Sequence, residues 1–470
     1  MTLAGAIRLV LALHAPAFVN GYDSSDYVSA AFDLATRGEF TLRFKRAPLY
    51  PLFIASGISR PGPTLEQIAL LQHGLGLLSV VLTYLLGAVA IGRGTGLLGA
   101  LGVAVNGALL LMERSIMSEV LFTPLLLLGT LLFLLAIRQD RHWIFILAGA
   151  TLGLAALTRP AAQAVLPLVL GLALLARSSW RWRLGASALI LLGYLVVTGP
   201  WLARNYAEHA TIAISGGLGD TLYARLRRHD RSFDFRDRGE PELDPTQARI
   251  RRRIFDLARE QNRGRPLQED LRDEFGLTEA QSDRALRDAD FQVIRQEPTR
   301  YVQSNLGMWL RLGLGIDKPL SQLWSTRIEG DRGQYWQTRH RFIIEQPFPN
   351  TTADFELTNA LTRLYQDQMI RPLILPLIVL GGLRCLSGWR QGLPLLPLIV
   401  LSQLLLYAAL DGPIARYRYP FQPMITLLAA AGLTLLSTAA WRRLAPLWHA
   451  GHRTSGEGNS PNGRPSPATR

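Results

Sequence analysis

The feature that most constrains this chain is a series of apolar blocks that carry almost no charge. Each block is about 17–25 residues long, which is the length that a helix needs to cross the hydrocarbon core of a bilayer. The blocks lie near residues 3–19, 67–92, 95–112, 119–137, 142–158, 161–177, 184–203, 371–388, 392–410 and 420–440. This pattern predicts an all-α membrane protein with about ten transmembrane helices.

The first block, near residues 3–19, is short and contains Arg8. A secretory signal peptide has an apolar segment of similar length, but it ends in a cleavage site of the type Ala-x-Ala. No such site precedes Gly21. We therefore interpret this block as a short first span.

The polar stretches between the blocks divide the chain into four predicted parts. Residues 205–369 are charged and rich in helix-forming residues, whereas the end of the chain has the low-complexity composition of a disordered segment. The predicted parts are an N-terminal transmembrane module at 1–204 with a first outer loop at 21–66, an extracytoplasmic domain at 205–369, C-terminal transmembrane helices at 370–442, and a disordered cytoplasmic tail at 443–470.

The charge of the chain indicates its orientation rather than a nucleic-acid partner. The formal net charge is +14, and most of the basic residues are arginines, many of them between apolar blocks. Short loops rich in Lys and Arg stay in the cytoplasm. If Met1 is cytoplasmic, one side of the membrane holds Arg93, Arg138, Arg141, Arg177, Arg181, Arg183, Arg384, Arg390 and the arginines of the tail.

With this orientation, the first outer loop and the 205–369 domain lie outside. Lys45 and Arg46 then lie on the side that the charge bias disfavours, which suggests an anionic partner. Cys385 is the only cysteine, so the chain has neither an intramolecular disulfide nor a cysteine-based metal site.

The first outer loop contains a predicted amphipathic helix on the membrane surface. Tyr27, Ala30, Ala31, Leu34 and Ala35 recur at helical spacing, and a glycine at 38 ends the pattern. The two acidic residues at 23 and 26 share a helix face if the helix starts there. The alternative is that the first of them only caps the helix.

The same loop carries a motif that resembles a known family. It reads Asp-Ser-x-x-Tyr, then Ala-x-x-Leu-x-x-x-Gly-x-Phe, then a basic residue before Pro-Leu-Tyr-Pro. This resembles the first outer loop of GT-C glycosyltransferases. It is closest to the bacterial relatives of dolichyl-phosphate-mannose protein mannosyltransferases (glycosyltransferase family 39) and the lipid A aminoarabinose transferases. The resemblance implies that Asp23, the first acidic residue of the loop, is the catalytic carboxylate. At position 47 the chain has an alanine where the family often has a proline.

Further motifs extend the resemblance over about residues 10–440. They are MSEVLF at 117–122, LTRP at 157–160, GPWLARNY at 199–206, SGGLGDTLY at 215–223 and RYRYPFQP at 416–423. Each is weak alone, but their order and spacing together resemble the family. The resemblance implies a GT-C fold in which these segments meet at the outer edge of the membrane.

A transfer of a sugar from a lipid phosphate needs a base for the acceptor hydroxyl and fixed cations for the departing phosphate. We predict Asp23 as the base, with Asp26 and Glu119 as supporting carboxylates, and we expect apolar walls or neighbouring carboxylates to raise the pKa of the base. The predicted phosphate ligands are arginines and a lysine at the outer membrane edge: Arg46 first, then Lys45, Arg159, Arg204, Arg416 and Arg418. For each cation, the alternative is a snorkelling or helix-end role. The remaining motif residues are Tyr27, Tyr50, Asn205 and Tyr417.

Cofactor binding stays open at this point. The three carboxylates could hold a divalent cation through oxygen ligands, but nothing in the pattern assigns a metal. The SGGLGD segment lacks the lysine and the strand–helix context of a phosphate loop, which argues against nucleotide binding. His14 and His73 lie in apolar blocks, where a lone histidine is more often a packing residue than a ligand.

The predicted function is that of an integral-membrane glycosyltransferase in the cytoplasmic (inner) membrane. It would move a sugar from a polyprenyl-phosphate donor to a hydroxyl acceptor (a lipid, a glycan or a protein) on the periplasmic or exterior face, without nucleic acid. One alternative is a polymerase or ligase of lipid-linked glycans, which Arg204, Arg416 and Arg418 would suit. Another is a transporter of lipid-linked sugars, which would place paired charges near mid-bilayer.

Overall fold

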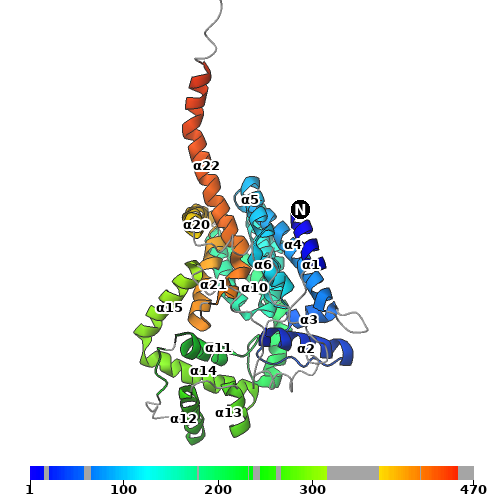
Figure 1. Cartoon of the computed structure of the whole chain (residues 1–470), viewed down its shortest axis with the longest axis vertical. Coiled ribbons are helices and arrows are strands. Elements are labelled where there is room, and N and C mark those ends of the chain that lie inside the picture. Colours follow the sequence, from blue (N-terminus) through cyan, green and yellow to red (C-terminus); the bar gives the residue numbers. More distant parts are fainter. Residues whose placement is uncertain are drawn as a thin grey trace, which may run out of the picture.

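A computed structural model of the chain describes residues 1–14, 21–57, 65–176, 179–230, 232–236, 244–260, 266–314, 370–412 and 414–453. Within these residues the secondary structure is helical and includes no strand. Figure 1 shows a bundle of long helices and, at one end of it, a cluster of shorter helices. Much of the predicted extracytoplasmic domain, at 315–369, and the last part of the predicted tail lie outside the described residues.

The bundle contains a helix at every predicted apolar block, although the end of the first block, at 15–19, lies outside the described residues. Its elements are α1 (Thr2–His14), α4 (Leu65–Ala90), α5 (Arg93–Ala104), α6 (Gly107–Arg114), α7 (Glu119–Gln139), α8 (His142–Thr158), η1 (Pro160–Ala164), α9 (Val165–Ala176), α10 (Trp180–His209), α20 (Ile370–Ser387), α21 (Leu395–Leu410), η4 (Ala415–Phe421) and α22 (Gln422–Arg453). The prediction of an all-α membrane protein is confirmed.

The helices of the bundle differ in length. Among the described residues, four are long and apolar enough to cross a membrane: 67–90, 119–139, 180–209 and 416–442. The pair α5 and α6 makes a fifth span if it is counted as one, although it bends by 53°. Asn106 sits at this bend, and its side chain accepts a hydrogen bond from the backbone of Leu109 at the start of α6. The other apolar blocks form shorter helices.

Two glycines allow one pair of bundle helices, α8 and α10, to approach closely. A Cβ atom on Gly149 of α8 would lie 2.0 Å from the carbonyl oxygen of Ile190 in α10, and one on Gly193 of α10 would lie 2.1 Å from that of Ile146. Small residues let membrane helices pack backbone to backbone. The close packing of α8 against α10 therefore requires residues without a side chain at positions 149 and 193.

Gly149→Val and Gly193→Val are expected to lower the thermal unfolding midpoint of the purified protein. Each side chain would collide with a backbone oxygen, and overpacking of this kind costs about 1–3 kcal/mol. Gly171→Val in α9 is the control, because no atom lies within 4 Å of its added Cβ. An equal effect of all three substitutions would show that helix propensity, rather than close approach, decides the outcome.

The first outer loop forms two helices, α2 (Gly21–Arg37) and α3 (Leu49–Ser56). The predicted helix end is confirmed, because Gly38 follows α2 with a φ of +72°. Tyr27 and Ala31 of α2 are buried against Ile54 of α3 and Ile116 of the α6–α7 connection. Much of the apolar face of α2 is therefore covered by protein.

The cluster at the end of the bundle has its own core. It contains α11 (Leu218–Tyr223), η2 (Ala224–Asp230), α12 (Pro245–Arg259), α13 (Leu267–Phe275), α14 (Glu279–Gln296) and α15 (Pro298–Leu314). We call these helices the outer helices. Their buried residues include Leu222, Phe255, Leu271, Leu286 and Val293.

Buried Arg225 ties the outer helices to the bundle. It donates hydrogen bonds to the carbonyl oxygen of Ala408 in α21, at 2.8 Å, and to Ser304 and Asn305 of α15. Its ion pair with Asp230 is 3.2 Å long. Two element ends differ from the predicted boundaries: α10 continues to His209, and α22 continues to Arg453, past the predicted start of the tail.

Candidate active site

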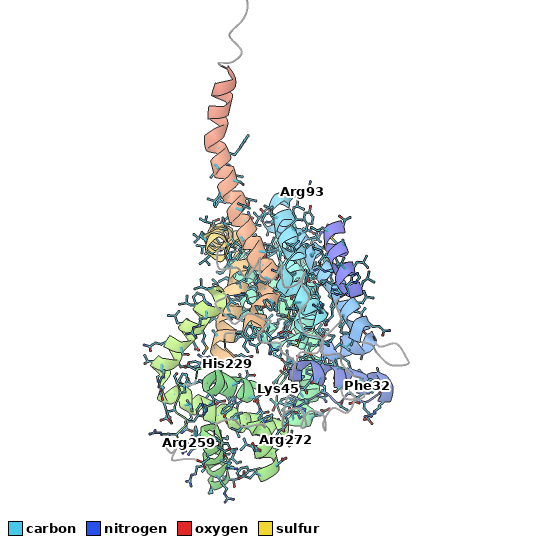
Figure 2. The ribbon with its side chains drawn as sticks, viewed as in Figure 1. Phe32, Lys45, Arg93, His229, Arg259 and Arg272 are labelled. Atoms are coloured by element: carbon cyan, nitrogen blue, oxygen red, sulfur yellow. The ribbon has the colours of Figure 1, made fainter. Side chains whose placement is uncertain are left out.

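The predicted base lies where the bundle meets the outer helices. Asp23 is in the first turn of α2, and Arg46 follows in the connection between α2 and α3. Arg416 belongs to η4, between α21 and α22. Figure 2 labels Lys45, next to Arg46, at the boundary between the two parts of the molecule, whereas Arg93 marks the opposite end of the bundle.

Both oxygens of the Asp23 carboxylate are held by arginines. Nη2 of Arg46 lies 2.6 Å from Oδ1 of Asp23, and Nη2 of Arg416 lies 2.8 Å from Oδ2. Arg46 also contacts Asp26 at 2.9 Å, and its guanidinium lies over the ring of Tyr27 with 5.3 Å to the centroid. Segments of the chain that are far apart in the sequence thus form one charged cluster.

The pKa of Asp23 moves in the direction opposite to our expectation. Burial alone raises it, but the charges of Arg46, Arg416 and Lys45 outweigh burial and lower the pKa well below its usual range. The sequence predicted a raised value because it showed neighbouring carboxylates without showing which cations meet them. Asp23 is therefore ionised, but its lowered pKa makes it a weak base, and both of its oxygens are occupied by guanidinium groups.

A second ion pair lies beside the first. Arg159 pairs with Glu119 at 2.8 Å and donates to Ser118 at 3.1 Å. Its guanidinium faces a stacked pair of rings, Tyr407 and Tyr417, whose centroids are 4.4 Å apart. The predicted supporting carboxylate and one predicted cation therefore occupy the same region as aromatic side chains of η4 and α21.

Lys45 points toward the outer helices rather than toward the carboxylates of the loop. Its Nζ is ion-paired with Asp220 of α11. The neighbouring Arg43 pairs with Glu279 of α14 at 3.3 Å, and the backbone N–H of Phe44 donates to the same carboxylate at 3.1 Å. The residues directly before Arg46 are thus fastened to two of the outer helices, α11 and α14.

Two other predicted cations have partners outside the cluster around Asp23. Arg204 pairs with Glu208 one turn along α10, at 2.6 Å, and its guanidinium lies over Trp201. Arg418 is buried and donates to the carbonyl oxygen of Leu312 in α15 at 3.1 Å. These contacts correspond to the helix-end role that the sequence left open, whereas Arg46 and Arg416 converge on one carboxylate.

The motif tyrosines and asparagine hold the backbone of the site. The rings of Tyr27 and Tyr50 meet edge to face at 5.0 Å, and the hydroxyl of Tyr50 donates to Gln72 of α4 at 2.6 Å. Asn205 donates to the carbonyl oxygen of Ala213 at 2.8 Å and so fixes the chain as it leaves α10.

Sequence reasoning missed Asp411, which follows α21. Burial raises its pKa, while a hydrogen bond from Tyr417 and the charge of Arg416 act in the opposite direction. The charge of Asp23 also contributes to the increase. In the sequence, the one feature that could have identified Asp411 is its position as an acidic residue at the predicted outer end of an apolar block.

Sequence reasoning also missed a buried ionic triad inside the bundle. Arg8 of α1 pairs with Glu113 of α6 at 2.6 Å, and Nδ1 of His73 in α4 lies 2.9 Å from the other oxygen of Glu113. A cavity of about 20 Å³ is lined by Arg8, Glu113, Glu119 and Tyr419 among others. His73 is therefore more than the packing residue that its apolar surroundings suggested.

The carboxylates of the site are not arranged as metal ligands. Asp23, Asp26 and Glu119 each face an arginine within 3 Å. In the part of the chain that the structure describes, no group of three or more His, Cys, Asp or Glu side chains could hold a metal ion. As the structure describes them, these three carboxylates are therefore arranged around arginines rather than around a divalent cation.

Comparison with known proteins agrees with the resemblance seen in the motifs. The sequence profile of the dolichyl-phosphate-mannose-protein mannosyltransferase family matches residues 45–203. This range includes Arg46, Glu119 and Arg159. No curated protein matches the sequence as a whole.

Solved structures share the fold at low sequence identity. The apo oligosaccharyltransferase of Archaeoglobus fulgidus superimposes with a TM-score of 0.50 and 14% identity over 98% of this chain. The oligosaccharyltransferase AglB of that organism, in complex with an inhibitory peptide and a dolichol-phosphate, gives 0.50 and 15% over 98% of this chain. This chain covers 52% of each, so it spans about half their length.

ArnT from Cupriavidus metallidurans, bound to undecaprenyl phosphate, gives a TM-score of 0.40 and 15% identity. The superposition covers 95% of this chain and 79% of the ArnT chain. The archaeal structures and the family profile, rather than ArnT, show that the chain is a membrane protein with the GT-C fold whose residues 45–203 match the dolichyl-phosphate-mannose-protein mannosyltransferase family.

Proposed function

We propose that this chain is an integral-membrane glycosyltransferase that moves a sugar from a polyprenyl-phosphate donor to a hydroxyl acceptor. The observation that carries the proposal is the clamp of Arg46 and Arg416 on Asp23 at the edge of the bundle. Here a carboxylate, two phosphate-binding cations and an apolar bundle meet. The archaeal protein with the same fold was solved with a dolichol-phosphate, which supports a lipid phosphate as the donor's carrier.

The reaction requires a proton acceptor and a way to stabilise the leaving group. The acceptor hydroxyl gives its proton to Asp23, and its oxygen forms a bond to the anomeric carbon of the sugar. The bond between that carbon and the phosphate oxygen breaks, and polyprenyl phosphate leaves. Guanidinium groups bind phosphate in a bidentate manner, so Arg46 and Arg416 stabilise the charge that develops on the leaving group.

The ion pairs of the resting site suggest an order of events. Asp23 and a donor phosphate would compete for Arg46 and Arg416, because each guanidinium has a limited number of N–H groups. Donor binding would draw the guanidiniums from the carboxylate and add negative charge nearby. Both effects raise the pKa of Asp23 toward the value that a general base needs. The donor would therefore prepare the base for the acceptor.

The contacts of the other cations favour a transferase over a polymerase or ligase. Arg204 and Arg418, which such an enzyme would use together with Arg416, are held by Glu208 and by α15. A transporter is the second candidate, because the Arg8–Glu113–His73 triad places paired charges inside the bundle. A transporter would leave the bond between sugar and phosphate intact.

The test is an assay for release of polyprenyl phosphate. Purified protein in nanodiscs receives a polyprenyl-phosphate sugar with a radiolabelled sugar, together with a whole-membrane extract, lipids included, as the source of acceptor. A transferase releases free polyprenyl phosphate and moves the label to the acceptor fraction. Label that crosses the membrane of sealed proteoliposomes while still bound to its carrier would instead support the transporter.

We also propose that the site faces the periplasm or exterior, since the arginine-rich short loops lie at the other end of the bundle. In a Cys385→Ala background, single cysteines at exposed Glu39 and Asp288 should react with an impermeant maleimide in intact cells. Cysteines at exposed Arg93 and Arg181 should react only after permeabilisation. The reverse pattern would contradict both the orientation and the proposed face.

A further inference from the structure

A basic pocket lies at the end of the bundle opposite to the candidate active site. It has a volume of about 720 Å³ and is lined by Ile137, Arg138, Leu175, Ala176, Arg183, Trp389, Arg390 and Gln391. The helix α7 begins at Glu119, beside the candidate site, and ends next to this pocket. Its 21 residues span about 30 Å at 1.5 Å per residue. The pocket is therefore separate from the chemistry proposed above.

Arginines from separate elements converge on this pocket. Arg138 comes from the last turn of α7, Arg183 from the first turns of α10 and Arg390 from the short helix η3 (Trp389–Gln391). Among the described residues that line the pocket, none is acidic. The retention of positive loops in the cytoplasm requires arginines on one side of the membrane, but it does not require them to meet in one cavity.

The contacts of two of these arginines leave them able to accept an anion. Arg138 is exposed, and one of its terminal nitrogens donates to the carbonyl oxygen of Ala90 at 2.9 Å. Arg390 is exposed and lies over the ring of Trp389 with 5.6 Å to the centroid. Asp140, which is two residues from Arg138 in the sequence, has a carboxylate oxygen that accepts a hydrogen bond from the indole nitrogen of Trp182 at 2.6 Å.

Apart from Gln391, the rest of the lining is apolar, and part of it is exposed on the outer surface of the bundle. Leu175 is 54% exposed and Trp389 is 43% exposed, and both line the pocket. Trp180, at the start of the adjacent α10, is 64% exposed. Exposed tryptophans at helix ends are typical of the level at which headgroups meet acyl chains. A ligand here would contact guanidinium groups and apolar side chains together.

We propose that this pocket binds the phosphate headgroup of an anionic phospholipid. The arginines would hold the phosphate oxygens as bidentate ligands. The acyl chains would follow the apolar surface that begins at Leu175, and the indole of Trp389 would lie beside the glycerol. Basic pockets between transmembrane helices on the cytoplasmic side bind such headgroups in membrane proteins. This inference does not depend on the proposed glycosyl transfer.

The test compares two triple variants that change charge equally. The pocket variant is Arg138→Gln/Arg183→Gln/Arg390→Gln. The control variant, Arg141→Gln/Arg181→Gln/Arg384→Gln, removes exposed arginines at the same end of the bundle that do not line the pocket. Each protein is delipidated in detergent and titrated with phosphatidylglycerol or phosphatidylethanolamine, and bound lipid is counted by native mass spectrometry.

The unchanged protein is expected to bind phosphatidylglycerol in preference to phosphatidylethanolamine. The pocket variant should bind phosphatidylglycerol at least about tenfold more weakly, because each guanidinium near a lipid phosphate contributes on the order of 1 kcal/mol. The control variant should stay within about twofold. Equal binding by both variants would overturn the proposal, because charge on that face would then suffice.

Two further measurements keep the test decisive. Arg390→Gln alone, compared with Arg384→Gln, changes one exposed side chain outside the long helices and should still weaken phosphatidylglycerol binding by about threefold or more. Inorganic phosphate at millimolar concentration should not displace the bound lipid. Displacement by phosphate, or loss of binding equally in Arg384→Gln, would show that the pocket is not a lipid site.

Discussion

Replacing Arg46 or Arg416 with alanine is expected to slow glycosyl transfer by between tens-fold and about a thousandfold. Each guanidinium approaches Asp23 within 3 Å, so each lies where a donor phosphate would meet the base. The loss of one charge-assisted contact to a developing phosphate costs on the order of 2–4 kcal/mol. Both the affinity for the donor and the rate of transfer should fall. Initial rates at several donor concentrations measure the two effects.

The matched control is Arg204→Ala. Arg204 was also predicted as a phosphate ligand, but its partner is Glu208 in the next turn of α10. Its removal should change the transfer rate by less than about threefold, since exposed pairs of this kind contribute about 0–1 kcal/mol. Unchanged donor use in both Arg46→Ala and Arg416→Ala would show that the phosphate binds elsewhere.

Asp23→Asn is expected to reduce transfer by at least about a hundredfold, which is typical for the loss of a positioned base. Asparagine keeps the size of the side chain and most of its hydrogen bonding but cannot accept the proton. The change also removes a negative charge between two partly buried guanidiniums, so the unfolding midpoint should be measured beside activity. Arg46 keeps Asp26 as a partner, and Arg416 keeps Tyr417.

The helix-capping alternative gives a different result. Asparagine caps a helix about as well as aspartate, so a protein in which Asp23 only caps α2 would stay active. Asp26→Asn is the control for electrostatics, because Asp26 contacts the same Arg46 and the substitution removes the same charge. It should reduce transfer less than Asp23→Asn does.

Two other carboxylates could replace Asp23 as the base. Glu119 lies beside Arg159, and Asp411 has a pKa that burial raises. If Asp23→Asn is active while Glu119→Gln or Asp411→Asn is inactive, the base moves to that residue and the transferase remains. Activity in all of these single variants would remove the carboxylate mechanism.

Local sequence was sufficient to predict the helices of the bundle. The length and low charge of each apolar block determine whether a helix can cross the bilayer, and every predicted block appears as a helix. The bend between α5 and α6 was not predicted, because it depends on a single cap at Asn106. The burial of the α2 face at Tyr27 was not predicted either, since it depends on contacts with remote segments.

The candidate site was only partly predictable for the same reason. Asp23, Asp26 and Arg46 lie in one short motif, so their proximity follows from local sequence. Arg416 joins them through tertiary packing, and the sequence indicated only that it lies at the outer membrane edge, not which carboxylate it meets. The sign of the pKa shift at Asp23 depends on which cations converge there, and Arg416 comes from the far end of the chain.

The buried triad shows where pattern reading fails. Arg8, His73 and Glu113 lie in separate apolar or mostly apolar helices, and each alone resembles a packing or helix-end residue. Their pairing requires α1 and α4 to bring Arg8 and His73 within 3 Å of Glu113 in α6. No spacing rule along the sequence can encode a contact between three helices.

The most direct test of the account is the affinity of Asp23→Asn for polyprenyl phosphate, measured beside its transfer activity. If Asp23 is the base and competes with the donor phosphate for Arg46 and Arg416, the substitution removes the competitor. Undecaprenyl phosphate is titrated into the purified variant in nanodiscs, and it should bind as tightly as to the unchanged protein or more tightly. Transfer by the same variant should fall at least about a hundredfold. A parallel loss of binding and transfer would show that Asp23 only builds the site, and retained transfer would contradict the account directly.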